Sequence, residues 1–588
     1  MDTVKIIIDG AEVAVTKGAT ILEASREADA KLFNMEIIIP TLYYYKGLVD
    51  VDESGVCVVE VAGCDAPVNA SETVVEEGMV ITTNSPTLFG TRREALAKIL
   101  AVHHHDCINC TRSAHCELQE LLHTHGFKNE PSLPEDQLLP LDYSNPVFVR
   151  DPNKCIRCGR CVAACGKVQG IGAISTVGEG LSAQVGPNDN PFKCAMKIGA
   201  VACTNCGQCL SVCPVGALVE KDCTDDVFAA IADPDKFVVV QAAPAVRAAL
   251  GEEFDFPMGV DVEGRLAAAL RELGFDKVFD TVLSADLTVM EESNELLERL
   301  ENGGSLPLIT SCCPGWVKYC ETYYPDLNRH LSSCKSPHQM FGAVTKSYYA
   351  EKMGIPKEKL VVVSVMPCTA KKFEITREDE CGAGVPDVDY VVTTRELARM
   401  LNKAEVQLRA MPSEAFDEPL GLGTGAGVIF GATGGVMEAA LRTAVEKVTG
   451  KPLETLEFTD IRGVQGIKEA SYELNGKTLK VAVVSGLANA KKLLDKVRSG
   501  KVDYQFIEIM ACPGGCVNGG GQPPVAAAKA AVCDVKAVRA EALYRNDAGK
   551  AIRKAHENPA VMELYREYLG EAGSEKAHTL LHTTYKVR

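Results

Sequence analysis

The sequence lacks the features that mark a membrane or exported protein. It has no run of about 20 uninterrupted apolar residues, the length that a membrane-spanning helix needs. Its start, MDTVKIIIDG, has no basic segment, no apolar segment and no twin arginine of the kind that signals export. Positive charge is scarce, since 61 Lys and Arg face 79 Asp and Glu, for a net charge of −18. We therefore expect a cytoplasmic protein without a membrane span, and no nucleic-acid partner, because nucleic-acid binding needs a basic face.

Cysteine, in contrast, is abundant. The chain has 24 cysteines in 588 residues. Disulfide scaffolds belong to small secreted domains, so cysteines in tight clusters of a long chain without an export signal favour metal ligation. Composition alone predicts an iron–sulfur or zinc protein of three or four domains.

The chain divides into four segments. Residues 1–85 are β-rich, with two strand-like runs joined at Asp9–Gly10, a typical hairpin dipeptide. Residues 86–145 combine helical spacing with a His/Cys cluster, and residues 146–222 hold two dense cysteine runs. Over residues 223–588, buried strand-like runs such as KLVVVSVM alternate with helical runs such as EGRLAAALRELG. This pattern predicts a multidomain protein of α+β and α/β class.

The two cysteine runs have the spacing of bacterial two-cluster ferredoxins. They comprise Cys155, Cys158, Cys161 and Cys165, and then Cys203, Cys206, Cys209 and Cys213. Short gaps let three thiolates meet one cubane, while the fourth cysteine of each run reaches the other cluster. One 4Fe–4S cluster is therefore assigned to Cys155, Cys158, Cys161 and Cys213, and a second to Cys203, Cys206, Cys209 and Cys165. Zinc ribbons pair CxxC units rather than tripling them, so electron relay is the expected role.

A histidine joins the third cluster motif. His103, Cys107, Cys110 and Cys116 form H-x3-C-x2-C-x5-C, which by its chemistry suits either zinc or iron–sulfur ligation. The spacing resembles that of the histidine-ligated 4Fe–4S cluster in large hydrogenases and in the large iron–sulfur subunit of respiratory complex I. That resemblance selects His103 among the neighbouring histidines.

Three further cysteine segments lie far apart in the sequence: TSCCPGW at 310–316, MPCTAKKFE at 366–374 and EIMACPGGCVNGGGQP at 508–523. Pro and Gly beside each cysteine allow tight turns, and the glycines suggest that the backbone closely approaches a ligand. Their residues alone predict only another buried cluster.

In this order, the three segments closely match the signature of FeFe-hydrogenases, and the resemblance extends over residues 90–588. It implies a two-lobed α/β catalytic domain and an H-cluster, a 4Fe–4S cluster linked by a cysteine to a diiron unit with CO, CN⁻ and an azadithiolate. By motif position, Cys313, Cys368, Cys512 and Cys516 would bind the cubane, with Cys516 bridging to the diiron unit. Lys371 would donate to one cyanide, Pro244 and Ala245 would lie beside the other, and Met366 and Met510 would pack around the unit.

The resemblance also implies a proton route through Cys312, Glu292, Ser332 and Glu295. Glu292 and Glu295 are three residues apart in a helical run and share one face. Judged from these residues alone, both would be solvated charges on an amphipathic helix.

The amino-terminal segment departs from the family. Large members open with a β-grasp 2Fe–2S domain, but its four ligand positions here hold Tyr43, Ser54, Cys57 and Ser71. Serine and tyrosine are poor ligands for iron–sulfur clusters, even with Cys64 nearby. We expect three accessory 4Fe–4S clusters, no 2Fe–2S cluster, and a docking or assembly role for the emptied domain.

Alternative functions are a hydrogen sensor, an iron–sulfur assembly relative or an electron-transfer subunit. Such non-catalytic relatives typically lose the shuttle thiol, whereas Cys312, Lys371 and Cys516 are all present here. Beyond H2 and protons, we expect ferredoxin or partner redox subunits within a larger complex, of a diaphorase-like, formate dehydrogenase or ferredoxin-like kind. The remaining cysteines, expected to be buried apolar thiols, are Cys194, Cys223, Cys320, Cys334, Cys381 and Cys533.

Overall fold

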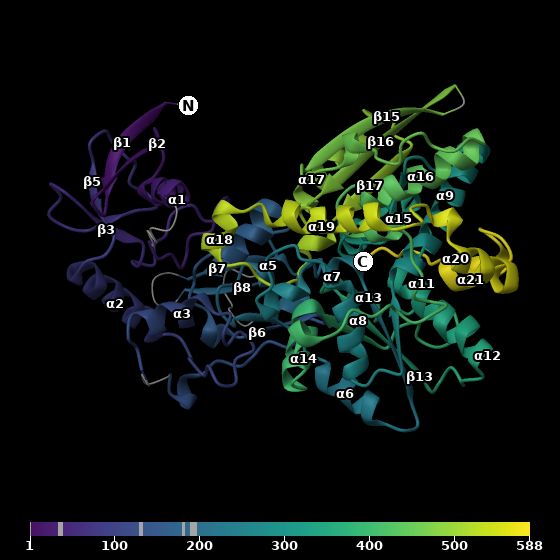
Figure 1. The fold of residues 1–588 in the computed structure, drawn as a ribbon, viewed down its shortest axis with the longest axis horizontal. Coiled ribbons are helices and arrows are strands. Elements are labelled where there is room, and N and C mark those ends of the chain that lie inside the picture. The colour runs from purple at the N-terminus through teal and green to yellow at the C-terminus, as the bar shows by residue number, and fades with distance from the viewer. Residues whose placement is uncertain (1, 33–38, 129–132, 179–182, 188–196, 475) are drawn as a thin grey trace.

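The computed structural model describes all residues except 1, 33–38, 129–132, 179–182, 188–196 and 475. The amino-terminal sheet lies at one end of the molecule, the sheets of the carboxy-terminal segment lie at the other, and the segment with the two cysteine runs lies between them (Figure 1). Among the described residues, no helix combines the length and apolarity of a membrane span.

The first segment folds as a mixed five-stranded sheet in the order β2-β1-β5-β3-β4. Its elements are β1 (Thr3–Ile8), β2 (Ala11–Thr16), α1 (Ile21–Leu32), β3 (Val58–Val61), β4 (Val68–Asn69) and β5 (Val80–Thr82). The predicted hairpin is confirmed: Ile8 pairs with Ala11, and Asp9 and Gly10 both have positive φ, as a two-residue turn requires. Alternating residues of β1, Ile6 and Ile8, are fully buried in the core of this sheet.

The middle segments are built around short elements that carry the cysteine runs. They comprise α2 (Pro86–Leu100), α3 (Glu117–Thr124), β6 (Phe148–Arg150), α4 (Arg160–Ala163), β7 (Ile174–Val177), β8 (Gln184–Pro187), α5 (Gln208–Ser211) and β9 (Leu218–Glu220). The duplicated runs adopt the same backbone: Arg157 and Asn205 have φ of 62° and 61°, and Gly159 and Gly207 have φ of 73° and 71°. The sequence repeat is therefore also a structural repeat.

The carboxy-terminal segment contains two four-stranded sheets, which confirms the predicted α/β alternation. The first is parallel throughout and consists of β11 (Lys277–Asp280), β10 (Phe237–Ala242), β13 (Leu360–Met366) and β14 (Tyr390–Thr393), in that order. The second consists of β12 (Leu308–Ile309), β17 (Phe506–Met510), β16 (Lys477–Ser485) and β15 (Ile467–Leu474). Only β15 is antiparallel, because it forms a hairpin with β16.

The helices around these sheets are α6 (Thr224–Ala232), α7 (Pro244–Arg247), α8 (Glu263–Glu272), α9 (Val282–Asn302), α10 (Pro314–Tyr323), α11 (Pro337–Val344), α12 (Ala350–Met353), α13 (Ala370–Glu374), α14 (Thr394–Lys403), α15 (Gly425–Val428), α16 (Gly435–Thr449), α17 (Leu487–Arg498), α18 (Ala527–Val532), α19 (Val535–Gly549), α20 (Pro559–Leu564) and α21 (Glu575–Leu581). Helix α9 matters most for the site. Its first three turns carry Glu292 and are buried against neighbouring helices, among them α11, α15 and α16.

One buried arginine joins the amino-terminal domain to the ferredoxin-like segment. The Arg160 guanidinium is fully buried and donates to the carbonyls of Leu42 and Tyr44, each at 2.9 Å. It also pairs with both carboxylate oxygens of Glu117 at 2.7 and 2.8 Å. Because a buried charge without its partners is costly, this interaction fixes the position of the domain.

Replacing Arg160 with alanine should detach the amino-terminal domain. Breaking a buried pair of this kind costs roughly 3–5 kcal/mol, so residues 1–85 should become sensitive to protease and the first unfolding transition should move to lower temperature. Arg566, whose side chain is 74% exposed, provides the control: Arg566→Ala should change neither. Equal protease resistance of Arg160→Ala and the unchanged protein would contradict the prediction.

Candidate active site and accessory cluster sites

A buried, largely apolar cavity lies where the two carboxy-terminal sheets meet. Cys313 lies between β12 and α10, Cys368 follows β13, Cys512 follows β17, and Pro244 begins α7 after β10. These are carboxyl ends of parallel strands, the edge at which open α/β sheets bind ligands. The lining includes ten residues predicted for the H-cluster region: Pro244, Ala245, Cys312, Cys313, Met366, Cys368, Lys371, Met510, Cys512 and Cys516.

Four of the lining thiols converge. Burial raises the pKa of Cys313, and it raises that of Cys368 to about 11, with Cys313 as the next contribution. The pKa values of Cys512 and Cys516 are raised by burial and then by Cys368 and Cys313. Buried thiolates so close to one another repel, so a strongly cationic metal centre is the partner that would stabilise all four together. The donor set and the apolar walls therefore fit an iron–sulfur cofactor.

Lys371 is the charged residue of the cavity wall. Its ammonium lies 3.1 Å from the Glu374 carboxylate and 3.5 Å from the Cys312 carbonyl. Glu374 also pairs with His338 at 2.5 Å. Burial opposes charge on Lys371, but Glu374 raises the pKa of the lysine, whereas burial and Lys371 lower that of His338 to about 4. A cationic donor therefore stays in an otherwise apolar wall, beside a neutral histidine.

Two glycines of the third cysteine segment also let neighbouring loops pack closely. A Cβ at Gly519 would lie 2.2 Å from the Pro367 carbonyl oxygen, and one at Gly520 would lie 2.4 Å from that of Cys206. Gly515 and Gly519 also line the cavity, so the close approach of this segment to a ligand stays a prediction. Gly520 brings the active-site loop against the ferredoxin-like run, which Gln208 reinforces by donating to the Asn518 carbonyl at 2.9 Å.

The predicted relay residues lie near one another. Glu292 is 2% exposed, so a solvated surface role is wrong for it, and burial raises its pKa to about 8. Ser332 hydrogen-bonds with Glu292 and donates to Glu295 Oε2 at 3.0 Å. Glu295 pairs with Arg299 at 2.5 Å, and its side chain is 14% exposed. After burial, Glu292 is the largest cause of the raised pKa of the Cys312 thiol, so Glu292 lies near the cavity wall, and Glu295 lies farther toward solvent.

The ferredoxin-type cysteines gather in the predicted sets. Burial raises the pKa of Cys161, followed by Cys158, Cys213 and Cys155. For Cys209 the corresponding causes are burial, then Cys206, Cys203 and Cys165. Each run therefore contributes its fourth cysteine to the other group, as two cubanes require.

In the third motif, His103 is buried and its Nδ1 lies 3.0 Å from the Lys154 carbonyl. A carbonyl can only accept, so Nδ1 carries the hydrogen and Nε2 keeps a lone pair that suits a metal. Cys110 raises the pKa of both Cys107 and Cys116, after burial in each case. The three thiols therefore lie near one another.

Five segments of the chain match known families. Residues 236–520 match the carboxy-terminal domain of the iron-only hydrogenase large subunit, and residues 533–588 match the iron hydrogenase small subunit. Residues 1–86 match a 2Fe-2S iron-sulfur cluster binding domain, residues 92–131 the NADH-ubiquinone oxidoreductase-G iron-sulfur binding region, and residues 154–217 a 4Fe-4S dicluster domain.

Similarity to characterised hydrogenases extends from end to end. The chain is 46% identical to the NADP-reducing hydrogenase subunit HndD of Solidesulfovibrio fructosivorans, covering 100% of this chain and 99% of the relative. It is 41% identical to iron hydrogenase 1 of Clostridium pasteurianum over 99% of both chains. The chain belongs to the FeFe-hydrogenase family. It is therefore an oxidoreductase acting on hydrogen, and its catalytic identity stands over the assembly-factor alternative.

The solved structures agree with this assignment. A variant of apo FeFe-hydrogenase HydA1 from Chlamydomonas reinhardtii is 43% identical with a TM-score of 0.55, and it aligns with 62% of this chain and 98% of its own. The match supports an H-cluster-type catalytic fold, to which this hydrogenase adds accessory iron–sulfur domains.

In the domain that matches 2Fe-2S proteins, the Asp52 carboxylate organises the loop that holds Tyr43 and Ser54, two of the four predicted ligand positions. Asp52 Oδ2 accepts from the backbone N–H groups of Leu42, Tyr43 and Tyr44 at 2.7–3.2 Å, and Asp52 Oδ1 accepts from Ser54. Ser71 accepts from Asp52 N at 2.8 Å. Tyr43 donates instead to the Ile156 carbonyl at 2.7 Å, in the loop between two ferredoxin-type cysteines. Cys57 is fully buried, and Cys64 is exposed.

Several features were not anticipated. Glu508 is fully buried near Cys312 and Cys516 and accepts from the N–H groups of Gly434 and Met437. The sequence signal that could have indicated this buried carboxylate was an acidic residue inside the apolar strand FIEIM. Cys381 is exposed, so its assignment as a buried thiol is wrong, whereas Cys320 and Cys334 are buried. Cys194 lies outside the described residues.

Ionisation of Glu292 should be visible by infrared titration. Its pKa is about 8 against an ordinary 4.5, so the folded protein keeps a proton that the unfolded chain loses between these values. Stability should therefore fall as pH rises across that window. A carboxylic C=O band should disappear as pH passes through about 8 and be absent from Glu292→Gln. The same band in Glu292→Gln would assign it elsewhere.

Proposed function

We propose that this hydrogenase catalyses the reversible oxidation of H2 to protons and electrons at an H-cluster held by Cys313, Cys368, Cys512 and Cys516. The observation that carries the proposal is the cavity itself. The residues predicted to surround the H-cluster come from separate segments between positions 244 and 516. They line one buried cavity at the strand ends of both carboxy-terminal sheets.

When bound, the H-cluster would supply redox-active iron for heterolytic cleavage of H2, with its CO, CN⁻ and azadithiolate ligands. The chain's residues orient and isolate it. Cys516 would also hold the diiron unit, and Lys371 would donate to a cyanide. Pro244, Ala245, Met366 and Met510 give an apolar wall that excludes water from the cavity.

Protons would pass between the cavity and water by way of Cys312, Glu292, Ser332 and Glu295. Cys312 lies beside the proposed ligand Cys313 in the cavity wall. The pKa of Glu292, about 8, lets its carboxyl hold or release a proton near neutral pH, as a relay requires. Ser332 hydrogen-bonds with Glu292 and Glu295, and its hydroxyl can reorient between them.

Removing the shuttle thiol or the buried acid should stop turnover without emptying the site. Cys312→Ala and Glu292→Gln should each lower H2 oxidation at least about 100-fold, the usual weight of a positioned acid or base. Iron content and the infrared bands of CO and CN⁻ should stay unchanged. Glu298→Gln, on the exposed face of the same helix, is the matched control and should retain activity. Near-normal turnover in both relay variants would contradict the route.

Electrons would travel through three accessory 4Fe–4S clusters: two on the ferredoxin-type cysteines, and one on His103, Cys107, Cys110 and Cys116. Ile108, within the third motif, is 95% exposed, so this cluster loop lies at the surface and offers an entry point. The physiological partner would be ferredoxin or redox subunits of a larger complex. The relative HndD is named as a subunit of an NADP-reducing hydrogenase, which favours a diaphorase-like partner over a formate dehydrogenase.

The proposal includes a cytoplasmic location, since the cysteines favour metal ligation over disulfides. It also keeps the four domains at residues 1–85, 86–145, 146–222 and 223–588. The first of these would contain no 2Fe–2S cluster and would act as a docking module. The Asp52 network and the Tyr43 contact with Ile156 support this, because they give the loop a hydrogen-bonded core and tie it to the neighbouring cluster segment.

Replacing Cys57 should test the empty domain in the intact protein. Without a 2Fe–2S cluster, Cys57→Ala should lose no iron and leave every EPR signal of the reduced enzyme unchanged. Cys158→Ala is the control and should lose a 4Fe–4S signal. A 2Fe–2S signal that disappears only in Cys57→Ala would overturn the assignment.

A further inference from the structure

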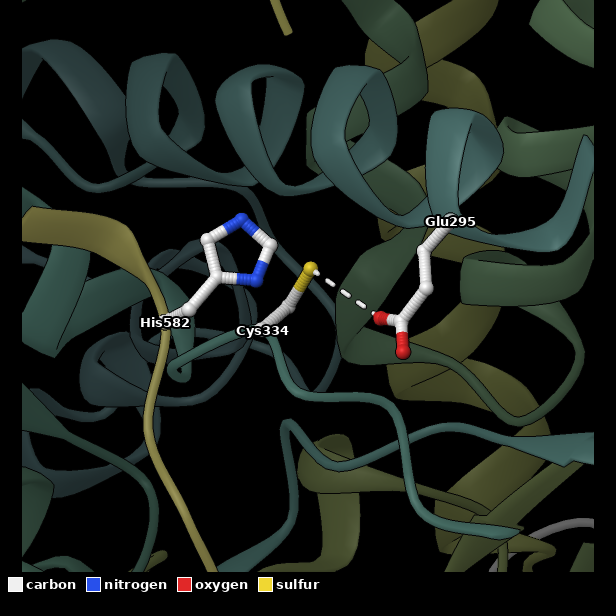
Figure 2. A group of neighbouring side chains, drawn as sticks. All are labelled: Glu295, Cys334 and His582. Atoms are coloured by element: carbon white, nitrogen blue, oxygen red, sulfur yellow. Dashed lines mark hydrogen bonds between the residues drawn. The ribbon is translucent and has the colours of Figure 1, made fainter. Parts of the chain in front are cut away.

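Three potential metal ligands from distant segments meet at the outer end of the proposed relay. Glu295 on α9, Cys334 before α11 and His582 after α21 place one ligand atom each within 4.8 Å of one another (Figure 2). Cys334 Sγ lies 4.0 Å from Glu295 Oε2. Thiolate, imidazole and carboxylate together form a donor set typical of zinc.

The histidine is oriented as a zinc ligand would be. His582 Nε2 lies 3.0 Å from Glu291 Oε2, and Nδ1 lies 2.8 Å from Ser333 Oγ. A carboxylate can only accept, so neutral His582 carries its hydrogen on Nε2 and directs the Nδ1 lone pair toward Ser333 and the Cys334 side (Figure 2). Metal-bound histidines almost always donate their other ring N–H to such a group.

Glu291 is itself held in place. It accepts from the Gly573 N–H at 2.9 Å and from the Tyr565 hydroxyl at 2.5 Å. The carboxylate that orients His582 is therefore fixed by two hydrogen bonds from the carboxy-terminal segment, as the outer-sphere partners of metal sites are held.

The local field favours a cation. Burial raises the pKa of the Cys334 thiol well above its ordinary value, and the carboxylates of Glu295, Glu292 and Glu291 raise it further. The Glu295 and Glu291 carboxylates would attract a divalent ion, whose charge would offset one thiolate and one carboxylate. Arg299 pairs with Glu295 Oε1, whereas Oε2 lies on the side of the thiol and accepts from the Ser332 hydroxyl and from the N–H and hydroxyl of Ser333. The Glu295 and His582 side chains are 14% and 7% exposed, so the group lies at the edge of the protein.

We propose that Glu295 Oε2, Cys334 Sγ and His582 Nδ1 form a Zn²⁺ site, with water in the fourth position, and that its occupancy stops turnover. On binding, Cys334 loses its proton to water and forms the sulfur–zinc bond, with no change of oxidation state. Ser332 and Ser333 turn their hydroxyls away from Glu295, whose carboxylate then no longer accepts protons. The inhibition rests on the relay in the proposed function, whereas the binding of zinc does not.

The experiment adds Zn²⁺ to the hydrogenase with its clusters loaded. X-ray absorption at the zinc edge should show one sulfur at about 2.3 Å and nitrogen or oxygen ligands at about 2.0–2.2 Å. H2 oxidation with an artificial dye should fall at least about tenfold, and a chelator should restore it, because positioned proton transfer contributes at least that much.

Variants separate the site from other zinc binding. In Cys334→Ala, X-ray absorption should show no sulfur ligand on zinc, and zinc should no longer inhibit H2 oxidation. The activity of this variant in the absence of zinc should be unchanged. Glu291→Gln should weaken zinc affinity roughly 10- to 100-fold, as loss of an outer-sphere partner does. The matched control is His556→Gln: His556 also lies between a hydroxyl and a carboxylate, but its group with Glu446 and Glu557 has no thiol. In this variant, zinc should keep its sulfur ligand and should still inhibit H2 oxidation.

The proposal is overturned if zinc shows no sulfur ligand, if it shows several sulfurs with loss of iron, or if Cys334→Ala keeps the sulfur. It is likewise overturned if Cys334→Ala is inhibited as strongly as the unchanged protein. Zinc bound through Cys334 without inhibition would uphold the site but overturn its effect on turnover, and with it the role of Glu295 in the relay. Cys312→Ala tests the rest of the relay separately.

Discussion

Four thiols buried together in one apolar cavity place the main constraint on this hydrogenase. Cys313, Cys368, Cys512 and Cys516 lie where water cannot solvate their charge, and each thiolate would oppose the ionisation of the others. A metal cluster removes that conflict because it replaces protons with a multivalent centre. The rest of the site follows from this requirement. The strand ends position the thiols, the apolar wall excludes water, and Lys371 remains charged only because Glu374 accompanies it.

A second consequence concerns how the accessory domains meet the catalytic one. Gly520 packs directly on the backbone at Cys206 and Gly207, and Thr369 donates to the Asn205 carbonyl at 2.9 Å. The active-site loops are therefore built against the loop of the nearest ferredoxin-type run. Any side chain at Gly520 would separate them, so this contact depends on a missing Cβ.

In the amino-terminal domain, a carboxylate organises the loop at the predicted ligand positions. Three of these positions hold Tyr43, Ser54 and Ser71, and the Asp52 carboxylate accepts the N–H groups of the loop. Hydrogen bonds to an anion are the strong ones, so this carboxylate holds the loop firmly. Arg160 and Tyr43 then convert the loop into a contact surface for the ferredoxin-like segment.

The sequence by itself determined the features that depend on local spacing. The duplicated C-x2-C-x2-C-x3-C runs predict two crossed cluster sites, and the alternation of strands and helices predicts the α/β segment, because both signals lie within short windows. The three carboxy-terminal motifs identified the family only through their combined resemblance. Tertiary structure alone decided which distant groups meet. It buried Glu292, brought Glu508 beside Cys312 and Cys516, packed Gly519 and Gly520 against neighbouring loops, and placed Cys334 and His582 near Glu295. Burial and long-range contact depend on how separate elements pack, and no local spacing contains that information.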